Sequence, residues 1–311
     1  MTSIRAAHPH ELPALLTYPN DAERNAATEA YLDGLLEAKC TRPDWCLVAE
    51  GAQGRPVGSV VLWTLPGHEV PYAVVLFEAP AGEPQVGAAL LEAAAAKARE
   101  LGADELEHVI DSPAQAPQFQ REPERRAELL RGSGFRVVRD GRRFGLRPVA
   151  GALPDDDPRL VFRSLAELGP GPFVDLLEEL LVETSDARLA HDVRTHGARG
   201  AAERLFEETA ELAHEPERWE LGYDADGAPA VISLPARNPS VHVIGFVGVA
   251  PAHRGKGYAA SAVLRGTRIL AAAGAAEIRG DCDAANTAMA KAFTRAGYEN
   301  FADRLEFSRA L

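Results

Sequence analysis

Cysteine and methionine are scarce in this sequence, with three and two copies among 311 residues. The cysteines Cys40, Cys46 and Cys282 are odd in number and lack the spacing of metal ligands, which argues against a disulfide framework or a thiolate metal site. We therefore expect free thiols in a reducing compartment and no bound metal.

Long apolar stretches are also missing. Charges, Gly or Pro interrupt the apolar segments before they reach the roughly 18 residues that a membrane-spanning helix needs. The chain runs from Met1 directly into patterned sequence, with no apolar segment before a small-residue cleavage site. These absences predict a cytoplasmic protein that does not enter a membrane.

Basic residues are in the minority, with 33 Lys and Arg against 46 Asp and Glu and a net charge of −13. This balance argues against nucleic acid as a partner, because binding it requires a basic face that neutralises phosphate. It is compatible with an amine ligand, since an acidic cleft raises the local concentration of cations.

The order of features in the first half of the chain recurs in the second half. Each half has a Trp that opens a strand–turn–strand segment, an Ala- and Leu-rich helix that stops at Gly, and a last helix closed by Gly. These residues are Trp45, Gly102 and Gly134 in the first half and Trp219, Gly274 and Gly297 in the second. A polar stretch rich in Pro and Asp separates the halves. We predict tandem domains over residues 1–150 and 159–311, joined by a linker near 150–159.

Each copy reads as a strand, two helices, two or three strands, a helix, a strand, a helix and a terminal strand pair. This mixture predicts an α+β fold with a central sheet flanked by helices. In the second copy we expect helices near 172–183, 198–212, 258–273 and 286–296, and strands near 218–224, 229–234, 241–249 and 276–281.

The segment that indicates chemistry spans residues 246–259, where an apolar strand leads through a Gly-rich turn into an Ala-rich helix. Gly255 and Gly257 allow the backbone to approach a ligand closely. Unpaired N–H groups and the helix dipole at the start of the helix attract an anion. The sequence therefore predicts an anion cradle, with Arg254 and Lys256 adding positive charge.

Two familiar phosphate loops fit this segment less well. A Walker loop requires Ser or Thr after its Lys, whereas Lys256 precedes Gly257. The dinucleotide fingerprint GxGxxG ends here in Ala260, which that position permits, so a dinucleotide-binding enzyme stays open as an alternative. Such loops generally follow the first strand of a domain, however, and this one follows about four strands.

The segment resembles the signature of the GNAT superfamily of acyl-CoA N-acyltransferases, in which Val-x-Pro is followed after two or three residues by Arg-Gly-x-Gly-x-Ala/Gly. Residues 249–259 fit this signature, although the longer family form begins with Gln or Arg where this chain has Ala252. Downstream, Asn286 opens a helix, with Met289 and Phe293 three and seven residues later, which is similar to the family's second coenzyme-contacting helix. Together these motifs resemble a tandem GNAT protein, similar in layout to mycothiol synthase.

The resemblance implies that acetyl-CoA is the co-substrate and that each domain has a mixed, mostly antiparallel sheet. The pantetheine arm would lie between the strands 241–249 and 276–281, and the amides of the Gly-rich turn would hold the pyrophosphate. The expected coenzyme-binding residues are Val247, Gly248, Val249, Arg254, Gly255, Lys256, Gly257, Tyr258, Ala259, Asn286, Met289 and Phe293.

The acid that protonates the departing thiolate is not evident. Many family members carry a Tyr for this purpose seven residues after the Asn, where this chain has Phe293. Tyr258, Tyr298 or a water remains as a donor, or the thiolate leaves unassisted, since a thiol with a pKa near 8.5 is a fair leaving group.

The general base also has several candidates. His242 lies on the strand before the loop, but period-two alternation directs it away from the cleft unless a bulge intervenes. Asp281 and Asp283, at the end of the neighbouring strand, are the other candidates, and a turn or helix-cap role competes with catalysis for both.

The matching segment of the first copy, residues 77–87, keeps a Pro and a helix start but lacks Arg-Gly-x-Gly. Glu83 and Pro84 would place a negative charge, and a residue without an N–H, where a pyrophosphate would lie. We expect a degenerate first domain and one coenzyme site per chain.

The leading functional hypothesis is an N-acetyltransferase that moves an acetyl group from acetyl-CoA to a primary amine of a small molecule or peptide by direct attack. The alternative is a non-catalytic acyl-CoA-binding regulatory module. We expect a monomer or homodimer.

Overall fold

The computed structural model describes residues 3–8, 10–16, 18, 20–51, 54–149, 151–184, 186–238 and 241–311. The chain forms two compact units, one of residues 1–139 with 304–311 and one of residues 140–303. The division therefore lies before the segment expected as a linker, and the last residues of the chain belong to the first unit.

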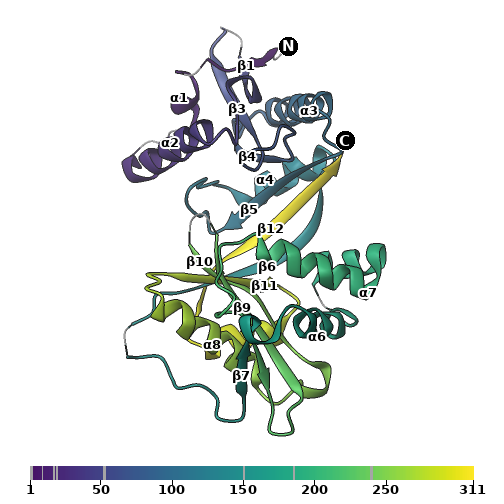
Figure 1. Ribbon diagram of the computed structural model, residues 1–311. Helices are drawn as coiled ribbons and strands as arrows, with labels where there is room; N and C mark the ends of the chain where they lie inside the picture. Colours follow the sequence, from purple (N-terminus) through teal and green to yellow (C-terminus); the bar gives the residue numbers. More distant parts are fainter. Residues whose placement is uncertain are drawn as a thin grey trace. The chain divides into compact units, whose positions relative to one another are not determined.

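The first unit is an α+β sandwich in the strand order β1-β2-β3-β4-β5-β12 (Figure 1). All described pairs are antiparallel except β4 with β5, which is parallel. Its strands are β1 (Ser3–Ala6), β2 (Cys46–Glu50), β3 (Pro56–Trp63), β4 (Ala73–Glu78), β5 (Glu105–Ser112) and part of β12 (Glu299–Ala310), and its helices are α1 (Leu12–Leu16), α2 (Ala22–Glu37), η1 (Pro43–Trp45), α3 (Pro84–Glu100) and α4 (Pro123–Gly132).

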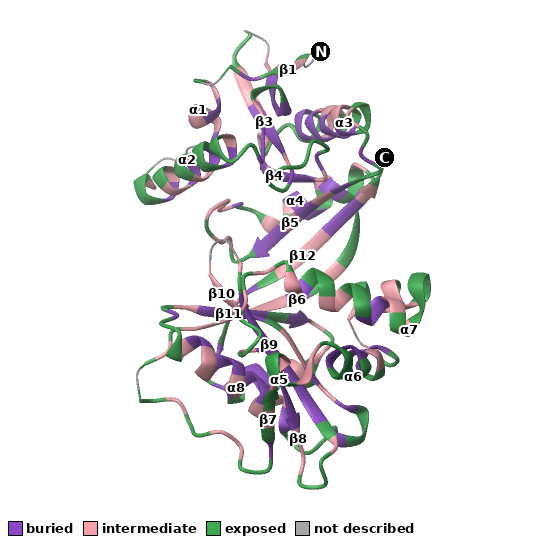
Figure 2. Ribbon diagram, in the orientation of Figure 1, coloured by how far each residue is buried: buried purple, intermediate pink, exposed green. Residues whose placement is uncertain are grey.

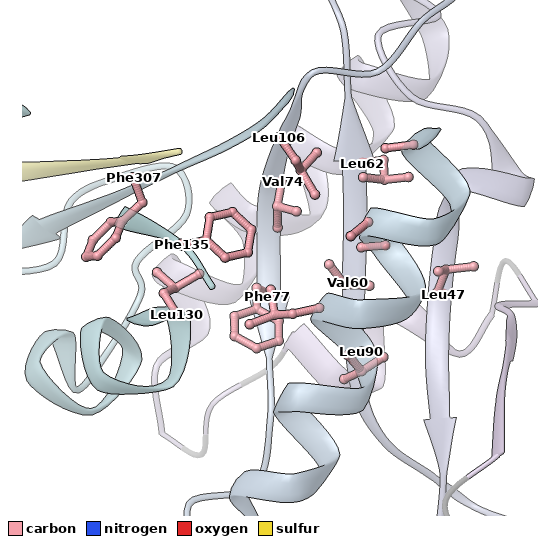
Figure 3. Close-up of a cluster of buried hydrophobic side chains, with 14 of the residues drawn as sticks. Leu47, Val60, Leu62, Val74, Phe77, Leu90, Leu106, Leu130, Phe135 and Phe307 are labelled. Atoms are coloured by element: carbon pink, nitrogen blue, oxygen red, sulfur yellow. The ribbon is translucent and has the colours of Figure 1, made fainter. Parts of the chain in front are cut away.

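The core of the first unit forms where α3 packs on the sheet. Leu90 of α3 lies among side chains of β2, β3 and β4, and Phe77 of β4 is almost fully buried beside it (Figure 3). Phe307 of β12 joins the same cluster, so the end of the chain is part of this core.

The second unit repeats the plan in the strand order β12-β6-β11-β10-β9-β8-β7. The β10–β11 pair is parallel and the other described pairs are antiparallel. Its strands are part of β6 (Arg136–Leu146) and of β12, with β7 (Val161–Ser164), β8 (Glu220–Tyr223), β9 (Pro229–Arg237), β10 (His242–Val249) and β11 (Ile278–Asp283), and its helices are α5 (Leu165–Leu168), α6 (Gly171–Leu181), α7 (Ala187–Ala210), η2 (Pro251–His253), α8 (Tyr258–Ala272) and α9 (Thr287–Arg295).

Helices cover the sheet of the second unit on both faces. The side chains of α6 pack with β8 and β9, and the buried side of α8 packs with β9 and β10. Figure 2 shows β9 buried along nearly its whole length, while much of α7 is exposed. The expected α+β fold with a mostly antiparallel, helix-flanked sheet is confirmed.

Two elements of the second copy differ from the expectation. The element α7 (Ala187–Ala210) consists of two helices that meet at Gly197, whose φ of 74° and ψ of 165° are not helical. The second lies where a helix was expected near 198–212, whereas the first, which has Asp186 as its N-cap, was not expected. The expected terminal strand pair is wrong: β12 is one long strand, since no Gly or Pro breaks its sequence.

Each unit contains a strand from the other half of the sequence: β6 belongs to the sheet of the second unit, and the end of β12 belongs to the first unit. In the second unit, β6 pairs with β11 from Ile278↔Leu146 to Asp283↔Gly141. In the first unit, Arg304 of β12 makes a two-pronged ion pair with Asp111 of β5, with both N···O distances 2.8 Å. Each sheet therefore depends on both halves of the chain.

Candidate active site

The parallel strands β10 and β11 of the second unit separate soon after they begin. They are paired only at His242↔Ile278 and Val243↔Arg279. Beyond these pairs β10 continues to Val249, still paired with β9 on its other side. The separation therefore leaves one edge of β10 without a strand partner beyond Val243, and we call this edge and the space beside it, where β11 has separated, the opening. An unpaired strand edge of this kind can accept an extended ligand.

A bulge in β10 lies at this opening, between Ile244 and Phe246. A Cβ on Gly245 would lie 2.8 Å from the carbonyl oxygen of Leu234, so this position requires glycine. The bulge shifts the alternation, and Phe246 packs with the α6 and α7 cluster while Val247 packs with the α8 cluster.

The backbone groups that face the opening follow from the pairing of β10 with β9. The amide of Ala250 donates to Ala230 of β9 at 2.9 Å. Because successive residues of a strand point their backbone groups to opposite sides, Gly248 also faces β9, and the N–H and C=O groups of Val247 and Val249 face the opening. These are two of the residues for which the family resemblance predicts backbone contacts with pantetheine.

The Gly-rich loop, which is predicted to bind an anion, follows directly after β10. Gly255 and Gly257 have φ angles of 80° and 84°, in the left-handed region that favours glycine. Gly257 is the N-cap of α8, and no side chain caps that helix. Within the described part of the chain, the N–H groups of residues 255–259 donate to no other group. They and the helix dipole remain to bind an anion.

The loop is attached to the β8–β9 turn by His253, a residue that the sequence did not indicate. His253 Nε2 lies 2.8 Å from Asp224 Oδ2, and both side chains are largely buried. Asp224 also accepts the amides of Asp226 and Ala228, and the hydrogen bond with His253 holds the pKa of this carboxyl below its usual value. Nothing local in the sequence pairs these two residues.

The cationic side chains of the loop differ in their surroundings. Arg254 is partly exposed and pairs with Glu183 at 3.3 Å. Lys256 is exposed, and its carbonyl oxygen accepts from Arg159. The guanidinium of Arg254 and the ammonium of Lys256 are therefore both at the surface, beside the Gly-rich loop.

The second expected motif begins helix α9. Asn286 is the N-cap, and its Oδ1 accepts the amide of Met289 at 3.1 Å. Phe293 is 1% exposed and stacks on Phe144 with ring centroids 4.9 Å apart. Its ring is therefore part of the core between α9 and the sheet.

His242, a predicted base, is the first residue of β10, where the strand is paired on both sides. Its register partner Ile278 lies in the cluster under α8 and α9, which places His242 on that face of the sheet. Partial burial and the charges of Arg237 and Arg218 lower its pKa, so the neutral imidazole is favoured.

Asp281 and Asp283 lie on the part of β11 that has separated from β10. Gly280 and Cys282 face the α9 cluster, so the two carboxylates point to the opposite face. Asp283 Oδ2 accepts the amide of Ala187 at 2.9 Å, at the start of α7, whereas Asp281 is exposed. Asp283 therefore anchors a helix, and Asp281 borders the opening.

The candidate acids are both buried tyrosines. Tyr258, the first residue of α8, is 7% exposed and packs with Leu160 and Ala262. Tyr298 has its hydroxyl 2.7 Å from that of Thr267, and burial raises the pKa of this phenol. These contacts hold both rings in the interior of the second unit.

The first unit has a similar separation of strands but fills it with its own side chains. Strands β4 and β5 are paired only at Ala73↔Glu107 and Val74↔His108. The carbonyl oxygen of Phe77, further along β4, accepts from the buried guanidinium of Arg126, which also pairs with Glu78 at 2.7 Å. The edge that would accept a ligand strand is therefore already occupied.

Three further observations concern the cysteines, metal ligation and membrane spans. The three cysteines are buried free thiols. In the described ranges, no cluster of three or more His, Cys, Asp or Glu side chains is suited to a metal ion. No helix of the described chain has the length and apolar character needed to span a bilayer.

Comparison with known proteins agrees with this geometry. Residues 230–298 match the sequence profile of the acetyltransferase (GNAT) family. A crystal structure of a GCN5-related N-acetyltransferase from Sphaerobacter thermophilus is similar with a TM-score of 0.62 and 16% identity, over 99% of this chain and 95% of that one. A comparison with curated protein sequences found no match.

A second solved structure is similar at lower coverage. It contains the GCN5-related glucosamine N-acetyltransferase region of a fungal multi-domain GH3 β-N-acetylglucosaminidase, with a TM-score of 0.54 and 15% identity, over 99% of this chain and 38% of that one. The residues matched by the family profile include β10, the Gly-rich loop, α8 and α9. Residues 230–298 thus match the GNAT acetyltransferase family, and over nearly its whole length the chain has a fold similar to that of a GCN5-related N-acetyltransferase.

Proposed function

We propose that the protein is an N-acetyltransferase that moves the acetyl group of acetyl-CoA to a primary amine of a small molecule or peptide. The observation that carries this proposal is the combination of an open β10 edge with the unpaired amides that begin α8. The first suits an extended pantetheine arm and the second a pyrophosphate.

The residues of the second unit fit such a coenzyme. The backbone groups of Val247 and Val249 would pair with the pantetheine amides, and the N–H groups of residues 255–259 would hold the pyrophosphate, with Arg254 and Lys256 beside it. Asn286 keeps its amide NH2 available, since only its Oδ1 caps α9. When bound, acetyl-CoA supplies the activated acetyl thioester.

Direct attack by the amine requires a proton acceptor on the side from which the amine approaches. Asp281 borders the opening on the face where α7 begins, whereas His242 lies on the other face, at the paired end of β10. We therefore favour Asp281, directly or through water, as the base. His242 is the second candidate, because its lowered pKa keeps the imidazole neutral.

Departure of the thiolate proceeds without a dedicated side-chain acid in this proposal. Phe293 lies in the core, and the side chains of Tyr258 and Tyr298 are buried in the hydrophobic clusters under α8 and α9. A thiol of pKa about 8.5 is a fair leaving group near neutrality, so an acid adds little. The backbone amide groups of β10 at the opening would stabilise the charge that develops on the thioester oxygen.

A non-catalytic acyl-CoA-binding module is the second candidate, and the absence of a Tyr at Phe293 favours it. An assay with acetyl-CoA and a panel of small amines and peptides separates the two, with free thiol as the readout. Amine-dependent thiol release supports the transferase. Tight coenzyme binding without thiol release for any amine would support the module.

A further inference from the structure

Arg159, in the segment before β7, is joined to the Gly-rich loop. Its Nε and Nη2 donate to the two carboxylate oxygens of Asp157 at 2.9 and 2.6 Å. Its Nη1 donates to the carbonyl oxygen of Lys256 at 3.2 Å, and its guanidinium lies 4.6 Å from the ring centroid of Tyr258. All three nitrogens of the guanidinium are therefore engaged.

Asp157 is itself held in place. Ser261 of α8 donates its hydroxyl to Asp157 at 2.7 Å, and the carboxylate side chain is only 11% exposed. The bidentate hydrogen bond with Arg159 holds the pKa of the Asp157 carboxyl well below its usual range, so this carboxyl stays ionised. The ion pair is thus fixed to the first turns of α8.

The hydrogen bond to Lys256 determines the direction of the next amide. A trans peptide is planar, so the carbonyl of Lys256 and the N–H of Gly257 point in opposite directions. With the carbonyl directed at Arg159, the N–H of Gly257 is directed away from it. Gly257 has φ 84°, and a glycine permits several backbone conformations, so the hydrogen bond from Arg159 restricts the orientation of this peptide.

We infer that Arg159 is a positioning residue for the coenzyme, which holds the Lys256–Gly257 peptide with the Gly257 N–H toward the pyrophosphate. The inference rests on the proposed function. Arg159 acts through this peptide, because three of its five N–H donors are directed at Asp157 and at the carbonyl of Lys256. Lysine cannot replace it, since an ammonium cannot form a bidentate hydrogen bond with Asp157 and also donate to the carbonyl of Lys256.

The test compares Arg159→Gln and Arg159→Lys with the parent in calorimetric titrations of CoA and of pantetheine, which lacks the pyrophosphate. Arg163→Gln is the matched control, because Arg163 is equally exposed, at 52%, and pairs only with the exposed Glu167 in an ordinary surface contact. We expect both Arg159 variants to bind CoA about tenfold more weakly, the effect of losing a charge-assisted hydrogen bond. Pantetheine binding should stay within twofold.

Asp157→Asn provides a second route to the same contact and should weaken CoA binding in the same selective way. CoA affinity within twofold of the parent in the Arg159 variants would overturn the inference, as would an equal loss for CoA and pantetheine. Failure of the parent protein to bind CoA would instead refute the proposed function, so the two failures are distinguishable.

Discussion

The Nδ1 atom of His108 lies 2.8 Å from the carbonyl oxygen of Val74, at the last residue pair that joins β4 to β5. Its Nε2 lies 2.8 Å from Gln120 Oε1, and the ring is fully enclosed. Arg126 donates a hydrogen bond to the carbonyl oxygen of Phe77. Side chains of the first unit therefore bind backbone groups of β4 that would be unpaired where β4 and β5 separate. In the second unit, the matching edge at Val247 and Val249 faces an opening, which is why we assign one coenzyme site per chain.

The cradle is tested by Gly257→Glu. A side chain there would occupy the anion site and add a negative charge, so we expect CoA binding to be lost, whereas the parent should bind one equivalent. Gly274→Glu is the control, because Gly274 has nearly the same φ, 85°, open space around it, and a place at the other end of α8. Both variants should lose about 1 kcal/mol of unfolding free energy. Calorimetry showing equal CoA affinity in the two variants would refute the site.

His108 predicts a pH dependence of stability in the first unit. Burial lowers its pKa from 6.5 to about 4, so between these values the unfolded chain binds the proton and the folded chain does not. Stability therefore falls as pH falls from 6.5 to 4, by about 1.4 kcal/mol per pH unit and about 3 kcal/mol in total. His108→Gln should show a correspondingly weaker loss in denaturant titrations at pH 7, 5.5 and 4.5. Parallel pH profiles for the two proteins would contradict this prediction.

The base is tested by Asp281→Asn and His242→Ala, with the exposed Asp303→Asn as a control. We expect the Asp281 variant to slow turnover by about 10²-fold, the lower range for general-base help, and the His242 variant by less than tenfold. If His242 were the base, its substitution would instead remove the fall in rate on the acidic side of the pH–rate profile. That fall would lie at or below pH 6.5, since the pKa of His242 is lowered. Comparing the pH–rate profiles on one substrate separates the two assignments.

Phe293→Tyr tests whether the missing tyrosine limits catalysis. Since thiolate departure needs no dedicated acid in our proposal, turnover should change less than tenfold, under about 1.4 kcal/mol of barrier. The new hydroxyl would lie in a core position that is 1% exposed, so we expect a loss of about 1–3 kcal/mol of stability. A large increase in thiol release by this variant would show that an acid had been lacking.

The Gly-rich loop and its helix could be predicted from the sequence because their signals are local. Gly255, Gly257 and the apolar periodicity around them specify a turn between a strand and a helix, and α8 begins at Tyr258 as expected. The family resemblance predicts backbone contacts with pantetheine at Val247 and Val249, and the backbone groups of both residues point away from β9.

Contacts between distant segments could not be predicted in the same way. The stretch near 150–159 reads as a linker because Asp and Pro are typical of loops, yet Asp156 pairs with Arg265 at 2.6 Å and Asp157 holds Arg159. The pairing of β12 with β5 likewise leaves no local trace, since a strand sequence does not specify its partner.

The most direct test of the central claim is to follow acetyl-CoA labelled with ¹³C in the acetyl group, by NMR and mass spectrometry, with the amine panel. We predict that the label appears as an amide on one class of amine, in equal amount to released CoA, and that Gly257→Glu abolishes both. CoA release that does not depend on an amine, or a labelled product formed equally by Gly257→Glu, would contradict the account.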